Sequence, residues 1–147
     1  MRESACRTVV SRLLIAAALG ASCAAAAQAP ASGDGVKVVL QVSEGTRQAK
    51  LALYMAKRDL DLDPRTRVEI VAYGEGVQFL QNDRLFSDEG PKVAALAARG
   101  VVFKVCENSL RASNLGRGDL LPRVEVVPSG TLEIARLQRE GYAYIRP

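Results

Sequence analysis

Apolar residues gather in short, nearly continuous runs along this chain, and longer segments with helical spacing separate those runs. Five runs predict strands, because each is short, apolar and bounded by glycine, proline or polar residues. These runs are residues 36–42, 66–73, 101–105, 124–127 and 142–145. Parallel strands that are buried on both faces have this continuous pattern, so the runs favour a largely parallel sheet.

Between the strands, apolar residues recur at the three- and four-residue spacing of a helix, most clearly from Thr46 to about Leu62. Pro64 ends that helix, since proline disfavours helical geometry in the residue before it. Shorter helices are predicted at residues 77–81, 91–99, 109–115 and 131–140. Strands that alternate with helices predict a three-layer α/β/α domain with a mostly parallel sheet of about five strands.

The first 27 residues have the composition of a secretory signal peptide. Three arginines precede an uncharged apolar run at residues 13–19, and the alanines at 25–27 fit a cleavage site. The apolar run is too short to cross a membrane, so we expect no stable membrane span. The segment therefore predicts a mature protein that is exported to the periplasm.

Lipid attachment at Cys23 is the alternative to cleavage after Ala27. Lipidation signals usually place a large aliphatic residue three positions before the cysteine, and Leu19 stands one place too early. Cleavage near Ala27 is therefore favoured. Residues 28–35 then form a flexible linker, and residues 36–147 form the folded domain.

Charge and composition exclude several classes of function. The net charge of +4 falls to +2 when residues 1–27 are removed, because three arginines and one glutamate leave with them. Basic residues do not interleave with aromatic ones, so nucleic acid is not an expected partner. The chain contains no histidine, which excludes Ser-His-Asp and Cys-His pairs and histidine-ligated zinc or haem. We expect neither a metal site nor a cofactor.

Cys106 is the only cysteine outside the predicted signal peptide. An internal disulfide is then excluded, and Cys106 is a buried thiol, a reactive thiol or an interchain link. Its position favours reactivity, because it ends a predicted strand just before a predicted helix, and a helix N-terminus stabilises a thiolate. The alternative is a small, packed and unreactive side chain, as free cysteine often is.

Neighbours of Cys106 support a site for an anionic sulfur. Asn108 and Ser109 can cap the predicted helix, and their backbone amides can hold the thiolate. Lys104 lies on the same strand face as Cys106 and would favour the thiolate if close, whereas Glu107 acts in the opposite direction.

Three other strand ends are expected to lie beside Cys106, because ligands of parallel sheets bind at the carboxyl ends of neighbouring strands. Gly74 and Gly76 resemble half of a phosphate-binding loop, although a tight turn explains them as well. Ser129 and Gly130 can bind an anion through backbone amides or simply cap a helix. Three glutamates at the strand ends, including that of Cys106, can act as acid or base or be solvated loop residues; they are Glu44, Glu75 and Glu107.

Four segments in order resemble the DsrE/DsrF family, in particular a branch that carries a signal peptide. They are residues 68–76, 100–110, 126–130 and 137–147, and the resemblance covers about residues 36–147. It implies a flavodoxin-like domain that associates into trimers or hexamers. For the best-understood members it also implies sulfur transfer by a cysteine that carries persulfide, and Cys106 sits where this branch has its cysteine.

Two functions from different classes remain open. In the first, Cys106 accepts a sulfane sulfur from a donor and passes it to an acceptor protein. In the second, the domain is a non-catalytic module for assembly or for binding a small anion, and Cys106 is merely packed. In the first function, the backbone amides of Asn108 and Ser109 stabilise the anionic sulfur. The crevice around it is shaped by Gly74, Gly76, Ser129 and Gly130.

Overall fold

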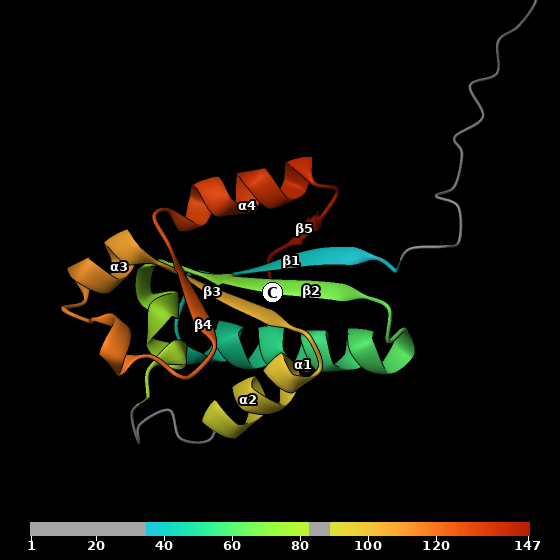
Figure 1. Ribbon diagram of the computed structural model, residues 1–147, viewed down its shortest axis with the longest axis horizontal. Helices are drawn as coiled ribbons and strands as arrows, with labels where there is room; N and C mark the ends of the chain where they lie inside the picture. Colours follow the sequence, from blue (N-terminus) through green and yellow to red (C-terminus); the bar gives the residue numbers. More distant parts are fainter. Residues whose placement is uncertain (1–34, 83–88) are drawn as a thin grey trace, which may run out of the picture. The chain divides into compact units, whose positions relative to one another are not determined.

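Five strands form one parallel sheet in the computed structural model, which describes residues 35–82 and 89–147 (Figure 1). Their order across the sheet is β4-β3-β2-β1-β5. The four strands that carry the candidate site therefore neighbour one another, as expected. The strands are β1 (Lys37–Val42), β2 (Arg67–Ala72), β3 (Val102–Cys106), β4 (Val124–Val127) and β5 (Ala143–Ile145).

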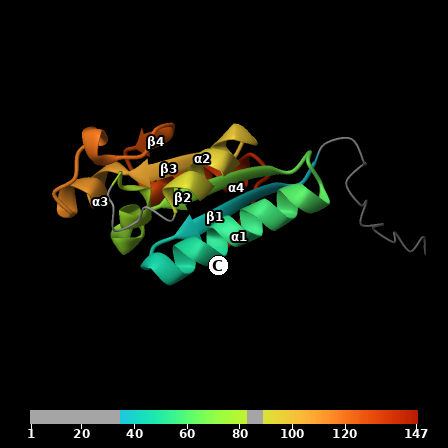
Figure 2. The same cartoon turned by 90° about the horizontal axis from the view of Figure 1, so that it is seen from below.

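The larger hydrophobic core lies on one face of this sheet, beneath helices α1 (Thr46–Leu62) and α2 (Gly90–Ala98). Figure 2, seen from below, shows both helices in front of the sheet. Leu40 pairs with Ile70, which pairs with Phe103, so three large apolar side chains lie in one row across the central strands. All three are fully buried and belong to this larger core.

The opposite face is covered by α4 (Gly130–Arg139) and has a smaller core. Its buried apolar residues are Val39, Val71, Ile134 and Leu137. The α/β/α layering is therefore confirmed, with two helices below the sheet and one above it in Figure 1. The remaining pieces lie at the strand ends and between strands; they are η1 (Gly74–Leu80), α3 (Glu107–Ala112) and η3 (Arg117–Asp119).

Two short elements begin earlier than the sequence predicted. The helical piece after β2 starts at Gly74 rather than at residue 77 and is a 3₁₀ helix. The helix after β3 starts at Glu107 rather than at residue 109, because the backbone of Cys106 is extended and makes Cys106 itself the N-cap. The prediction that Asn108 or Ser109 caps this helix was wrong, since both lie inside its first turn.

The predicted signal peptide (residues 1–27) and all but the last residue of the predicted linker lie outside the described residues. Within the part of the chain that the structure describes, no helix is long and apolar enough to cross a membrane.

Candidate functional site

Cys106 lies where two helices begin. It ends β3, pairs with Val127 of β4 and is the N-cap of α3. The N-terminus of α4 approaches from the other side, because a Cβ atom added to Gly130 would lie 3.3 Å from Cys106 Cβ. Unpaired N–H groups at both helix starts therefore face the region of the sulfur.

The pKa of the Cys106 thiol is lowered by this surrounding. Burial of the side chain raises the pKa, but the Gly130 N–H, the Ser109 hydroxyl and the Ser109 and Asn108 N–H groups together lower it by more. The side chain makes no cap hydrogen bond of ordinary geometry to α3. The donors thus act on the sulfur as nearby dipoles that favour the thiolate over the neutral thiol.

The turn after β2 holds the Ser109 hydroxyl in place. The Gly74 N–H donates a hydrogen bond to Ser109 Oγ at 2.8 Å. Gly74 has a φ of 57°, in the left-handed region that glycine tolerates best. Since Ser109 Oγ accepts from Gly74, its own proton is available for the sulfur of Cys106. The tight turn at Gly74 is therefore also a part of the site.

Gly76 and Ser129 support the backbone around the site. A Cβ atom on Gly76 would lie 2.2 Å from the Val42 carbonyl oxygen, so only glycine lets η1 pack against the end of β1. Ser129 is the N-cap of α4, and its hydroxyl accepts the Leu132 N–H at 3.4 Å. Of the six predicted binding residues, the structure places Asn108, Ser109 and Gly130 beside Cys106. Gly74 contacts Ser109, and Gly76 and Ser129 support the backbone around the site.

A hollow of about 360 Å³ lies next to Cys106 but is not lined by it. Asn108 and Ser109 line this hollow and also lower the pKa of the thiol. These two residues therefore lie between the hollow and the sulfur. Glu75 lines the hollow as well. Cys106 itself is 6% exposed in the single chain. The thiol is thus beside an open space without facing it directly.

Comparison with known proteins identifies the family. A model of the DsrE/DsrF-like family matches residues 36–147. The chain belongs to this family. The resemblance to the DsrE/DsrF family over residues 36–147 is therefore confirmed. No curated protein matches the chain.

Solved structures agree with this assignment. A protein of unknown function from Methanobacterium thermoautotrophicum, MTH1491, is 38% identical, with a TM-score of 0.71 over 76% of this chain and 99% of that one. The ychN protein from E. coli is 13% identical, with a TM-score of 0.64 over 78% and 100%. BT1422 from Bacteroides thetaiotaomicron, a conserved protein of unknown function, is 12% identical, with a TM-score of 0.55 over 76% and 94%. The last two share the fold.

This DsrE/DsrF-like domain also carries a buried ionic cluster that the sequence did not reveal. Lys104 Nζ lies 2.6 Å from Glu69 Oε2 and 2.6 Å from Glu133 Oε1, and Arg136 binds Glu133 from the exposed side. Burial lowers the pKa of Lys104, but the Glu133 and Glu69 carboxylates raise it by more. Lys104 does share a strand face with Cys106, as predicted, yet its ammonium is held by two carboxylates.

The other strand-end glutamates have separate surroundings. Glu44 forms an ion pair with Arg146, which ties the end of β1 to the C-terminal segment. Glu107 is the first residue of α3, and Glu75 faces the hollow. Within residues 35–82 and 89–147, no three acidic or cysteine side chains gather in a group that could hold a metal ion.

Proposed function

We propose that this DsrE-type protein handles sulfur through the thiolate of Cys106. One observation carries the proposal: N–H groups from the starts of α3 and α4, together with the Ser109 hydroxyl, converge on the sulfur and lower the pKa of the thiol. A lower pKa increases the fraction of thiolate, which is the nucleophilic form. The same donors can hold the negative charge of a terminal persulfide sulfur.

The proposed step is an exchange of one sulfur atom. The Cys106 thiolate attacks the sulfane sulfur of a donor persulfide, R–S–SH, and forms a new Sγ–S bond. The S–S bond of the donor breaks, and the leaving thiolate R–S⁻ takes the electron pair. Cys106 then carries a persulfide, and an acceptor thiolate can remove the outer sulfur in the same way. No external oxidant or reductant is needed.

The proposal includes a location and an assembly. Residues 1–27 direct the protein to the periplasm, the mature domain assembles as a trimer or hexamer, and a sulfur donor or acceptor protein is its partner. The composition of the N-terminal segment and the family membership support these points. Sedimentation of the mature protein tests the assembly, and cell fractionation tests the location.

A non-catalytic assembly or anion-binding module is the second candidate. The observation that favours it is the 6% exposure of Cys106, because a covered thiol behaves as a small apolar side chain. In this case the N–H groups around the sulfur are simply those of the first turns of α3 and α4 and have no chemical role. The adjoining hollow then holds a small anion or nothing.

Intact mass spectrometry after incubation with polysulfide separates the two candidates. The carrier predicts that the wild-type protein gains sulfur that a mild reductant removes, and that Cys106→Ser gains none. Absence of any gain from the folded protein would contradict the carrier and leave the module. The same spectrum gives the mature N-terminus, and so distinguishes cleavage after Ala27 from lipid attachment at Cys23.

Alkylation of the folded and the denatured protein gives a second test. A carrier thiol labels quickly in the folded protein, whereas a packed thiol labels only after denaturation. Non-reducing electrophoresis, run on the same samples, detects an interchain disulfide through Cys106 if one forms.

A further inference from the structure

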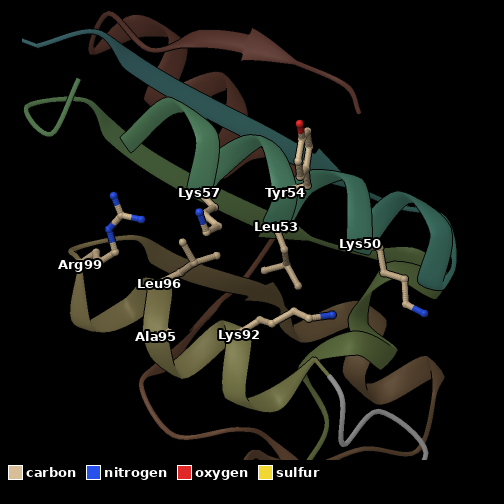
Figure 3. A pocket seen from close by; sticks show the side chains of 8 residues that line it. All are labelled: Lys50, Leu53, Tyr54, Lys57, Lys92, Ala95, Leu96 and Arg99. Carbon is tan, nitrogen blue, oxygen red and sulfur yellow. The ribbon is translucent and has the colours of Figure 1, made fainter. Parts of the chain in front are cut away.

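A second hollow, of about 400 Å³, lies between α1 and α2, the helices on the face of the sheet opposite α4 (Figure 3). Its floor is apolar, since Leu53 points from α1 toward α2 and Leu96 points back toward α1. Tyr54, which is 58% exposed, and Ala95, which is also exposed, complete the sides. We call this hollow the α1–α2 groove. It contains no residue of the Cys106 site.

Four cations surround this apolar floor. Lys50 and Lys57 come from α1, Lys92 comes from α2, and Arg99 is the C-cap of α2. Arg99 and Lys50 lie at opposite ends of the groove in Figure 3. Each end also has one acidic residue, shared by two of the cations. The rim therefore keeps an excess of two positive charges.

The cations at the Arg99 end are held closely by their acid. Asp61 Oδ2 lies 2.6 Å from Lys57 Nζ, and Asp61 Oδ1 lies 2.8 Å from Arg99 Nη1. Hydrogen bonds from Lys57 and Arg99 lower the pKa of Asp61, so its carboxylate stays ionised and keeps both partners. The two cations at this end are therefore less available to bind a further anion.

The cations at the other end are held loosely. Glu89, whose side chain is 2% exposed, lies 3.8 Å from Lys50 Nζ, and both of its oxygens accept long hydrogen bonds of 3.3 Å from Lys92 Nζ. Both lysines remain more than half exposed. One buried carboxylate therefore faces two lysines at longer distances than those at Asp61. An anion that enters the groove finds two available ammonium groups here.

We propose that the α1–α2 groove binds a small amphiphile with an apolar body and a single anionic head, such as a medium-chain carboxylate. The body lies over Leu53 and Leu96, and the head lies between Lys50 and Lys92. The volume suits this class, because ligand pockets span roughly 300–1,000 Å³ and this hollow is near the lower limit.

The size of the groove also argues against a partner helix as its occupant. Its floor offers two large apolar side chains, Leu53 and Leu96. A docked helix needs several anchor side chains spaced along a longer groove. The proposal is independent of sulfur chemistry at Cys106.

Three probes with the same eight-carbon chain test the proposal on the mature wild-type protein: octanoate, 1-octanol and octyltrimethylammonium. Calorimetry measures affinity, and amide chemical shifts in NMR locate the site. Octanoate is expected to shift the resonances of Lys50, Leu53, Lys92 and Ala95, and to bind about tenfold more tightly than the cationic probe, since two rim lysines contribute. Equal affinity for all three probes, or shifts elsewhere only, would overturn the proposal.

Variants separate the apolar floor from the charged rim. Ala95→Phe places a ring in the groove and is expected to weaken octanoate binding at least about tenfold, whereas Ala94→Phe makes the same change at an exposed neighbour outside the groove and serves as its control. Lys92→Gln should weaken octanoate by about two- to fivefold, with little effect on 1-octanol. Arg58→Gln removes an equal charge outside the groove and should change neither.

Two results would overturn the proposal even if a phenylalanine variant failed to fold. One is octanoate binding that Lys92→Gln leaves unchanged at low salt. The other is a wild-type protein that sediments as an oligomer and does not bind octanoate, which would favour a second copy as the occupant of the groove.

Discussion

Ser109 Oγ accepts a hydrogen bond from the Gly74 N–H at 2.8 Å, and the same hydroxyl lowers the pKa of Cys106. Gly74 follows β2, whereas Ser109 lies in the first turn of α3, so the contact joins two neighbouring strand ends. The acceptor role toward Gly74 leaves the hydroxyl proton for the sulfur. The turn after β2 therefore affects the thiol indirectly, because it orients the Ser109 hydroxyl that lowers the pKa of Cys106.

Ser109→Ala is expected to raise the pKa of Cys106. The variant loses the hydroxyl dipole that favours the thiolate over the neutral thiol. Thiolate absorbance in the ultraviolet, followed against pH, measures this pKa without requiring access to the sulfur. Ser113→Ala, at the other end of α3, is the control and should leave the pKa unchanged. A Ser109→Ala curve that overlays the wild-type curve would remove Ser109 from the site.

Gly130→Ala is expected to disturb both packing and the thiol. The added Cβ would lie 3.0 Å from Tyr73 Cβ and 3.3 Å from Cys106 Cβ, so the start of α4 or these neighbours must move by a few tenths of an ångström. Overpacking of this kind costs about 1–3 kcal/mol, and displacement of the Gly130 N–H should raise the pKa of Cys106.

Urea unfolding and the thiolate titration measure the two effects of Gly130→Ala. Gly118→Ala is the control, because a Cβ there has no neighbour within 4 Å. If Gly130→Ala were as stable as the wild type and had the same thiol pKa, the close approach of α4 to Cys106 would be contradicted.

The order and type of the main elements could be predicted from the sequence, because each strand is a continuous apolar run and α1 has a clear helical period. The position of Cys106 in the site could be predicted from the same pattern, because Cys106 ends a strand whose carboxyl end lies near those of three other strands. These features are local, and a parallel sheet puts the carboxyl ends of adjacent strands together.

The partners of individual side chains could not be predicted, because they depend on strand register and on how α4 crosses the sheet. Lys104 meets Glu69 only because β2 and β3 pair with Val71 opposite Lys104, and it meets Glu133 only because α4 lies above them. The cap of α3 was missed for a different reason. Asn and Ser are common N-caps, yet the extended backbone of Cys106 places the cap two residues earlier than Asn108.

Lys104→Met is expected to destabilise the domain strongly. Lys104 is the cation shared by Glu69 and Glu133, whose side chains are 11% and 12% exposed. Removal of one partner from a buried ionic group costs about 3–5 kcal/mol, because the remaining charge stays buried and uncompensated. Lys57→Met breaks an exposed pair with Asp61 and should cost only about 0–1 kcal/mol. Equal losses in urea unfolding would show that the cluster contributes no more than a surface pair.

Stability is expected to fall in acid through Glu133. Hydrogen bonds from Arg136 lower the pKa of Glu133 most, burial opposes them, and Lys104 adds to the lowering, so the pKa falls from 4.5 to about 2. The folded state thus holds the carboxylate more strongly ionised than the unfolded chain does. The resulting stabilisation is present above pH 4.5, amounts to at most about 3 kcal/mol, and is lost as the pH falls toward 2.

Glu133→Gln tests this assignment, because glutamine has no proton to gain. We expect the variant to be less stable than the wild type at neutral pH and to lose less stability between about pH 5 and pH 2, as measured by urea unfolding at each pH. Glu140→Gln removes an exposed carboxylate that also binds Arg136, and should keep the wild-type acid profile. If Glu133→Gln lost stability in acid as steeply as the wild type, the acid sensitivity would lie in other carboxylates, and Lys104 would be held mainly by Glu69.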